Sequence, residues 1–158
     1  MKYTEAFRRT GLYTDVYRES KSILDYNNMK PTHIVGGYVF KHIIQDFYGT
    51  TPSYKDIDYI VAKNHQPIEL PPGWIQDHTR FGNPRLKGPH YTIDIIPLDE
   101  VKDVLSKQLR PSIEYFMATT PLTIQSIAYD INNDQVIDQL GKDAIDRKVI
   151  EVNSLKHA

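Results

Sequence analysis

The chain of 158 residues contains no cysteine, so disulfides, thiolate zinc sites and a cysteine nucleophile are excluded. No apolar run approaches the roughly 18 residues that a membrane-spanning helix needs. The opening segment, MKYTEAFRRT, also lacks the apolar stretch of a signal peptide. We therefore expect a protein that has no membrane partner and stays in the cytoplasm, where it is made.

Charge and composition exclude further classes. The formal net charge is −1, so the whole molecule has no field that would attract nucleic acid, and any contact with a polyanion must be local. Hydrophobic residues make up 40% and charged residues 25%, which is typical of folded domains. The six histidines show no metal-ligand spacing, so a zinc site is not expected. We expect one domain over 1–158, with a helical extension over 1–30 and a core over 32–152.

The hydrophobic pattern predicts an α+β fold, in which a sheet carries helices mainly on one face. The stretches 71–73 and 82–89 are predicted as loops because they are rich in glycine and proline, with short extended pieces between and after them. Helices are expected over about 13–27, from Val39 to Phe47, over about 101–105 and 112–117, and near Asp143. Strands are expected over 32–35, 56–61, 91–96, 126–131 and 135–137.

Gly36 and Gly37 separate a predicted strand from a predicted helix. Missing side chains let the backbone approach a ligand, and the start of the helix offers unpaired N–H groups and a positive dipole end. This arrangement suits a phosphate group. The alternative is a tight turn needed only for packing, and neither the dinucleotide pattern G-x-G-x-x-G nor the P-loop pattern G-x-x-x-x-G-K-[ST] is present.

Asp56 and Asp58 stand two positions apart in a predicted strand. Their side chains therefore project from the same face and can converge on a cation. Carboxylate oxygens suit Mg²⁺, whose coordination is completed by water and substrate phosphates, and phosphoryl-transfer sites often hold two ions about 3.5–4 Å apart. The alternative is a solvated strand end.

Asp94 lies inside the strand-like segment Thr92–Ile96, although aspartate is depleted from strand interiors. Burying an unpaired carboxylate costs on the order of several kcal/mol. If this strand lies beside that of Asp58, a third carboxylate joins the pair and a bound cation relieves the repulsion. The alternative is the exposed face of an edge strand.

A cluster of donors lies in the predicted loop region between the acidic strands. Such side chains can hold a triphosphate or an acceptor. The alternative is that they are only solvated. The cluster comprises His78, Arg80, Arg85, Lys87 and His90.

Two segments, His33 to Val39 (HIVGGYV) and Lys55 to Val61 (KDIDYIV), resemble the DNA polymerase β-like nucleotidyltransferase superfamily. Its hallmark is a strand, Gly-Gly or Gly-Ser, a helix, then D-x-D on the next strand and a third carboxylate on a later strand. The head domain of CCA-adding enzymes and bacterial poly(A) polymerases is more similar still. That resemblance includes 122–130 (LTIQSIAYD), 136–141 (VIDQLG) and 146–150 (DRKVI).

The likeness covers about 32–152 and implies the nucleotidyltransferase fold with its mixed sheet. It departs from the family in two places. The polymerases carry Arg-Asp where this chain has Phe40-Lys41, and Arg-Arg-Asp where it has Thr-Thr-Pro at 119–121. The phosphate and base contacts of those groups are therefore absent. The chain resembles a stand-alone head domain, so CCA addition itself is not expected.

The resemblance implies an enzyme that transfers a nucleoside monophosphate from a nucleoside triphosphate to an acceptor hydroxyl of RNA, protein or a small molecule. Its cofactor would be Mg²⁺, or Mn²⁺ in its place, held by Asp56, Asp58 and Asp94, with Asp94 beside the attacking hydroxyl. Two alternatives stay open, a catalytically degenerate module that binds nucleotide or RNA and a component of a toxin–antitoxin pair. The expected nucleotide-binding residues are Gly36, Gly37, Lys55, Arg85 and Lys87.

Overall fold

The structure, a computed structural model, describes residues 1–62, 67–80, 82–97 and 112–153. Its helices are α1 (Lys2–Thr10), α2 (Asp15–Tyr26), α3 (Gly37–Tyr48), α5 (Ile113–Ala118) and α6 (Gly141–Arg147), with a short 3-10 helix η2 (Thr123–Gln125). Its strands are β1 (Pro31–Val35), β2 (Asp56–Val61), β3 (Ile75–His78), β4 (Pro84–Lys87), β5 (Thr92–Pro97), β6 (Ile127–Asp130) and β7 (Gln135–Asp138).

The strands form one sheet in the order β3-β4-β5-β2-β1-β6-β7. The neighbours β2 and β5 run parallel, and the other neighbouring pairs run antiparallel. The predicted α+β class is therefore confirmed, and the sheet is mixed. Because β2 and β5 lie inside the sheet, both edges of each strand are paired.

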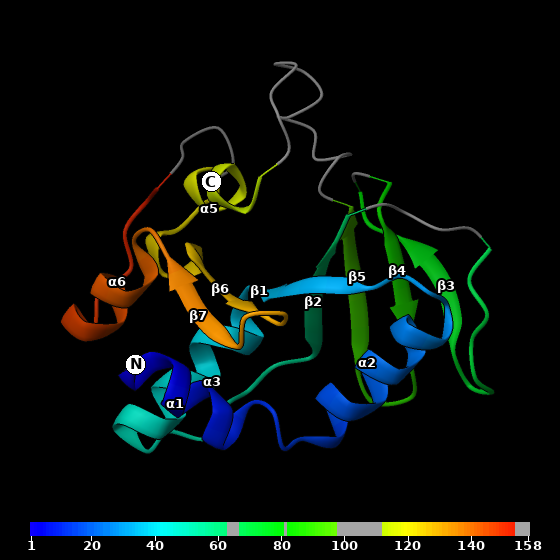
Figure 1. The fold of residues 1–158 in the computed structure, drawn as a ribbon, viewed down its shortest axis with the longest axis horizontal. Helices are drawn as coiled ribbons and strands as arrows, with labels where there is room; N and C mark the ends of the chain where they lie inside the picture. Colours follow the sequence, from blue (N-terminus) through cyan, green and yellow to red (C-terminus); the bar gives the residue numbers. More distant parts are fainter. Residues whose placement is uncertain (63–66, 81, 98–111, 154–158) are drawn as a thin grey trace.

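Two layers of helix cover the sheet unequally. Ile57 and Tyr59 of β2 belong to the main hydrophobic core, and α1, α2 and α3 pack on that face (Figure 1). The opposite face carries a smaller cluster, in which Val35 and Ile60 pack with Met117 of α5. Helices α1 to α3 thus lie on one face, in agreement with the prediction that helices lie mainly on one side of the sheet, and α5 lies on the other face.

The N-terminal extension contributes directly to the core. The helical extension expected over 1–30 contains two helices, and only the position of the second was predicted. Ala6 and Phe7 of the first, α1, are fully buried, and its acidic first turn and basic last turn match the helix dipole. Helix α2 confirms the prediction over 13–27. It begins after Thr14, whose hydroxyl accepts a hydrogen bond from the backbone N–H of Tyr17 at 3.0 Å.

The prediction of a loop over 82–89 is wrong in its middle, where strand β4 pairs with both β3 and β5. Leu86 is fully buried on the core face, and its neighbours Arg85 and Lys87 point to the opposite face, as the alternation of a strand requires. Pro84 stands at the first position, where a strand tolerates a missing N–H. The glycines and prolines that suggested a loop flank the strand, and Arg85 and Lys87 are therefore strand residues.

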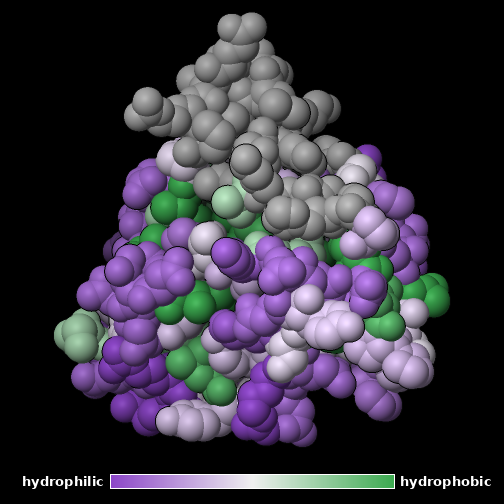
Figure 2. All heavy atoms as spheres, turned by 45° about the vertical axis from the view of Figure 1, so that its right-hand side comes forward, coloured by the Kyte–Doolittle hydropathy of each residue, from purple (hydrophilic) through white to green (hydrophobic). Residues whose placement is uncertain are grey.

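The other predicted strands are found close to their expected bounds, and the helices expected over 112–117 and near Asp143 correspond to α5 and α6. The helix expected over 101–105 lies outside the described residues. No helix in the described part of the chain is long and apolar enough to cross a membrane. On the face shown in Figure 2, hydrophobic residues form small groups among hydrophilic ones, an ordinary surface for a folded protein.

Candidate metal centre

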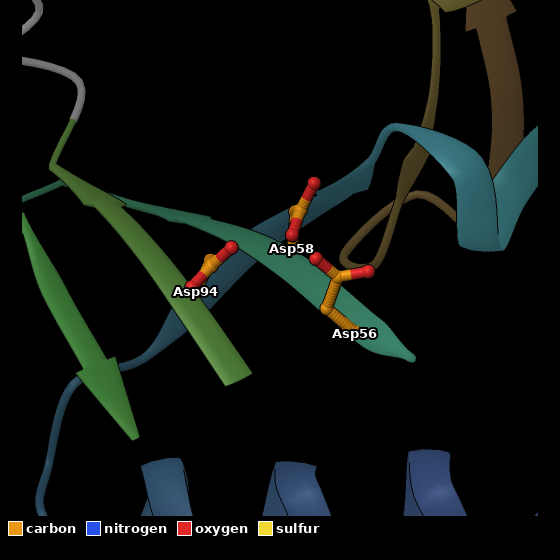
Figure 3. Close-up of side chains that lie close together, drawn as sticks. All are labelled: Asp56, Asp58 and Asp94. Atoms are coloured by element: carbon orange, nitrogen blue, oxygen red, sulfur yellow. The ribbon is translucent and has the colours of Figure 1, made fainter. Parts of the chain in front are cut away.

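The carboxylates of Asp56, Asp58 and Asp94 point toward one another from the central strands β2 and β5 (Figure 3). One oxygen from each lies within 4.8 Å of the others. The parallel pairing of the strands places Asp58 directly opposite Asp94, and Asp56 lies two residues earlier on the same face. The predicted cluster is therefore assembled by the sheet register.

Burial increases across the three carboxylates. Asp56 is exposed at the start of β2, Asp58 is partly buried, and Asp94 is only 8% exposed. Strand β5 lies between β4 and β2, so the alternative that placed Asp94 on the exposed face of an edge strand is wrong. The description of a solvated strand end fits Asp56 alone.

Arg85 of β4 neutralises Asp94 from the other side of β5. The antiparallel pairing places the two residues opposite each other, with Arg85 Nε 2.7 Å from Asp94 Oδ1 and Nη2 3.2 Å from Oδ2. This two-point contact raises the pKa of Arg85. The site therefore contains one fixed cation beside three carboxylates.

Asp58 is the electrostatically strained member of the cluster. Burial, and then the negative charges of Asp94 and Asp56, raise its pKa to about 8, while the charge of Arg85 opposes the rise. Its Oδ1 atom is buried and has no hydrogen-bond partner among the described residues. Since an unpartnered buried polar atom is costly, a cation at this point would stabilise the site. The oxygen donors fit Mg²⁺ or Mn²⁺.

Gly36 brings the backbone against this carboxylate. Its φ is +76°, a conformation that favours glycine, and an ideal Cβ there would lie 2.7 Å from Asp58 Oδ2. At Gly37, a Cβ would make only ordinary contacts with Lys41. The need for glycine at position 36 therefore comes from the backbone conformation and from the close approach to a candidate metal ligand.

The predicted nucleotide-binding residues divide into two groups. Arg85 joins the carboxylate cluster, whereas Lys87 forms an exposed ion pair with Asp77 of β3 at 3.0 Å. Lys55 is exposed immediately before Asp56. The remaining members of the predicted donor cluster are also exposed: His78, Arg80 and His90.

Lys41 also lies in this region, at a position where the sequence departs from the polymerases. It lies four residues after Gly37, so its side chain points back toward the start of α3. Its ammonium donates a hydrogen bond to the carbonyl of Ser53 at 2.5 Å, in the segment that leads to β2. The spacing of four residues from a helix-opening glycine is the signal that could have identified it.

Comparison of the chain with protein-family models, curated proteins and solved structures finds no significant match in any of the three. The function is therefore inferred from the geometry of the site. The fold and the site define a class, namely an α+β protein whose central strands carry a cluster of three carboxylates suited to a divalent cation.

Proposed function

We propose that this protein is a Mg²⁺-dependent nucleotidyltransferase of the DNA polymerase β-like kind. The observation that carries the proposal is the convergence of Asp56, Asp58 and Asp94 beside the turn at Gly36. Three carboxylates from two rigid strands, next to a helix start that has no capping side chain, suit a metal ion together with a phosphate chain.

The metal ligands would divide according to their burial. Asp56 and Asp58 would hold the metal at the phosphates, and Asp94 would complete the site next to the acceptor. When bound, the ions would neutralise charge on the phosphates and on the leaving group. The pair between Arg85 and Asp94 is compatible with this role, because each carboxylate oxygen can accept more than one bond.

The reaction would be an in-line displacement. The acceptor hydroxyl oxygen forms a bond to the α-phosphorus while the bond from that phosphorus to the bridging oxygen of the β-phosphate breaks. Pyrophosphate leaves with the bonding electron pair, and the hydroxyl proton passes to Asp94 or to water. Asp94 would orient the acceptor, since it is held in position by Arg85 and by its place in the sheet.

The start of α3 would receive phosphate oxygens. The first N–H groups of a helix have no acceptor within the helix, and Gly36 offers no side chain to cap them. The carbonyl of Gly36 already accepts bonds from Val39 and Phe40, which fixes the turn. The N–H groups at the start of α3 therefore lie on rigid backbone beside the carboxylates, and they would need little reorganisation to bind phosphate oxygens.

The first test is nucleotide binding. The thermal stability of the wild type would be measured with ATP, GTP, CTP and UTP, each with and without Mg²⁺, alongside Asp56→Asn/Asp58→Asn. A ligand at 100 times its Kd stabilises a protein by about 2.7 kcal/mol, so binding should raise the melting temperature. The matched control is Asp15→Asn/Asp143→Asn, which removes two exposed carboxylates far along the chain from the site.

The second test is transfer. Nucleotides labelled on the α-phosphate would be incubated with the protein alone and with RNA, protein and small alcohols as acceptors, while pyrophosphate release is followed. Label transfer that the Asp56/Asp58 variant loses would establish the reaction and its acceptor class. Mg²⁺-dependent binding without transfer would favour the degenerate binding module, and no metal-dependent nucleotide binding would overturn the proposal.

A further inference from the structure

A carboxyl group and an ammonium group lie beside the start of α3. Asp58 approaches the turn at Gly36, and Lys41 approaches it one residue further on. An ideal Cβ on Gly37 would lie 3.6 Å from Lys41 Cε and 3.8 Å from its Nζ. The ammonium of Lys41 thus lies beside Gly37, and the candidate metal ligand Asp58 lies beside the preceding residue, Gly36.

The cations of this region differ in what neutralises them. Arg85 pairs with Asp94, and Lys87 pairs with Asp77. Within the part of the chain that the structure describes, Lys41 has no carboxylate partner, and its acceptor is the carbonyl of Ser53. An ammonium has three donor hydrogens, so this single bond leaves two for a ligand.

We propose that Lys41 binds the triphosphate of the nucleotide and contacts the phosphates that leave as pyrophosphate. The inference rests on the proposed nucleotidyltransferase function. In this proposal the α-phosphate lies at the carboxylates, which adjoin Gly36, and the β- and γ-phosphates would extend past Gly37 to Lys41, which lies beside that residue. A lysine at that place neutralises the leaving group as a point charge and needs no fixed bidentate geometry.

The bond to Ser53 would keep the ammonium in place. It ties α3 to the segment that enters β2 at Asp56, so the lysine is held beside the backbone of Gly37. A purely structural role for the same bond would be to hold this segment. The two roles predict different results when the lysine is removed. Loss of a structural lysine would disturb the carboxylates and metal binding, whereas loss of a phosphate-binding lysine would not.

The experiment compares ligand binding by wild type, Lys41→Met and Lys41→Arg. Dissociation constants would be measured for a nucleoside triphosphate and the matching monophosphate in Mg²⁺, and separately for Mn²⁺ alone by its effect on water relaxation. We expect Lys41→Met to weaken triphosphate binding about tenfold or more, with a smaller effect on the monophosphate and none on Mn²⁺. Lys41→Arg should retain most of the affinity.

Lys21→Met is the matched control, since it removes one positive charge from α2 with the same substitution. It should bind triphosphate as the wild type does. If Lys41→Met does not fold, Lys41→Gln takes its place, because it removes the charge and keeps a donor that can bond to a carbonyl.

Three results would overturn the inference. Unchanged triphosphate binding by Lys41→Met, with loss in Asp56→Asn/Asp58→Asn, would reject the role of Lys41 alone. Equal loss of triphosphate, monophosphate and Mn²⁺ binding would show that Lys41 is only structural. No nucleotide binding by the wild type would reject the role of Lys41 together with the proposed function.

Discussion

Arg85 donates hydrogen bonds to both carboxylate oxygens of Asp94 across the β4–β5 pair, from Nε to Oδ1 at 2.7 Å and from Nη2 to Oδ2 at 3.2 Å. Removing the guanidinium in Arg85→Ala leaves a buried carboxylate beside two others. In metal-free buffer we expect a loss of about 2–3 kcal/mol in the free energy of unfolding, below the limit for a fully buried pair because the Arg85 side chain is 36% exposed. Urea denaturation measures this loss, and added Mg²⁺ should restore part of it.

The control for Arg85→Ala lies on the same strand. Lys87→Ala breaks an ion pair whose two side chains are 46% and 52% exposed, so it should cost much less stability than Arg85→Ala because solvent screens the pair. Equal losses for the two variants would mean that Arg85 contributes only a surface charge.

Asp58 should make the metal-free protein less stable as the pH rises. Its pKa of about 8 in the folded state exceeds the roughly 3.9 of an unfolded aspartate. The folded state therefore binds more protons between those values, and the stability contribution falls through that window. Asp58→Asn removes the effect, so in EDTA it should match wild type near pH 4 and be more stable by about 1–3 kcal/mol at pH 9.

Unfolding free energies at several pH values would check this expectation. Asp56→Asn is the comparison, since it makes the same substitution at an exposed carboxylate on the same strand. A wild-type minus Asp58→Asn difference that stays constant with pH would contradict the burial of charge at Asp58.

Gly36→Ala separates backbone strain from the approach to Asp58. Gly49 has a similar φ, +73°, but an added Cβ there meets no atom within 4 Å. Gly49→Ala should therefore cost only the conformational penalty, about 1–2 kcal/mol. Gly36→Ala should cost more and should also weaken Mg²⁺ binding, because its Cβ displaces the Asp58 carboxylate.

Calorimetric Mg²⁺ titration and urea denaturation of both glycine variants test this pair. In the background of Asp58→Ala, the excess cost of Gly36→Ala should disappear, as expected for two residues in direct contact. Equal stability losses for Gly36→Ala and Gly49→Ala would show that the contact with Asp58 is unimportant.

His42 should make the protein sensitive to acid. It is 3% exposed and packs against the rings of Phe7, Tyr38 and Tyr54. Burial lowers its pKa, so the unfolded chain binds the proton more readily and stability falls as the pH decreases through about 6.5. His42→Leu should reduce this loss in denaturation experiments at pH 5 to 7.5. The matched control is His90→Leu, which removes an exposed imidazole.

The sequence predicted the parts of the site that depend on local pattern. The alternation of Asp56 and Asp58 in a short strand, and an aspartate in the β-branched segment around Asp94, are visible without knowledge of the fold. The meeting of those strands followed from one assumption, that they are neighbours, and the sheet confirms it. The superfamily assignment itself stays a prediction.

The parts that were missed depend on register and on backbone conformation. The pairing of Arg85 with Asp94 requires the antiparallel register of β4 with β5. The glycines and prolines that flank β4 led to its prediction as a loop. The contact between Gly36 and Asp58 depends on a positive φ that no periodicity reveals. Helix α1 is short and mostly polar, and it forms because Phe7 and Ala6 are buried against the rest of the chain.

The parallel pairing of β2 with β5 has a consequence for how the site is built. Parallel neighbours cannot be joined by a tight turn and need a long connection between them. Here that connection includes β4, which lies at the outer side of β5 and presents Arg85 to Asp94. The segment that topology demands to join the two acidic strands thus also delivers the counter-charge that lets them lie together before any ion binds.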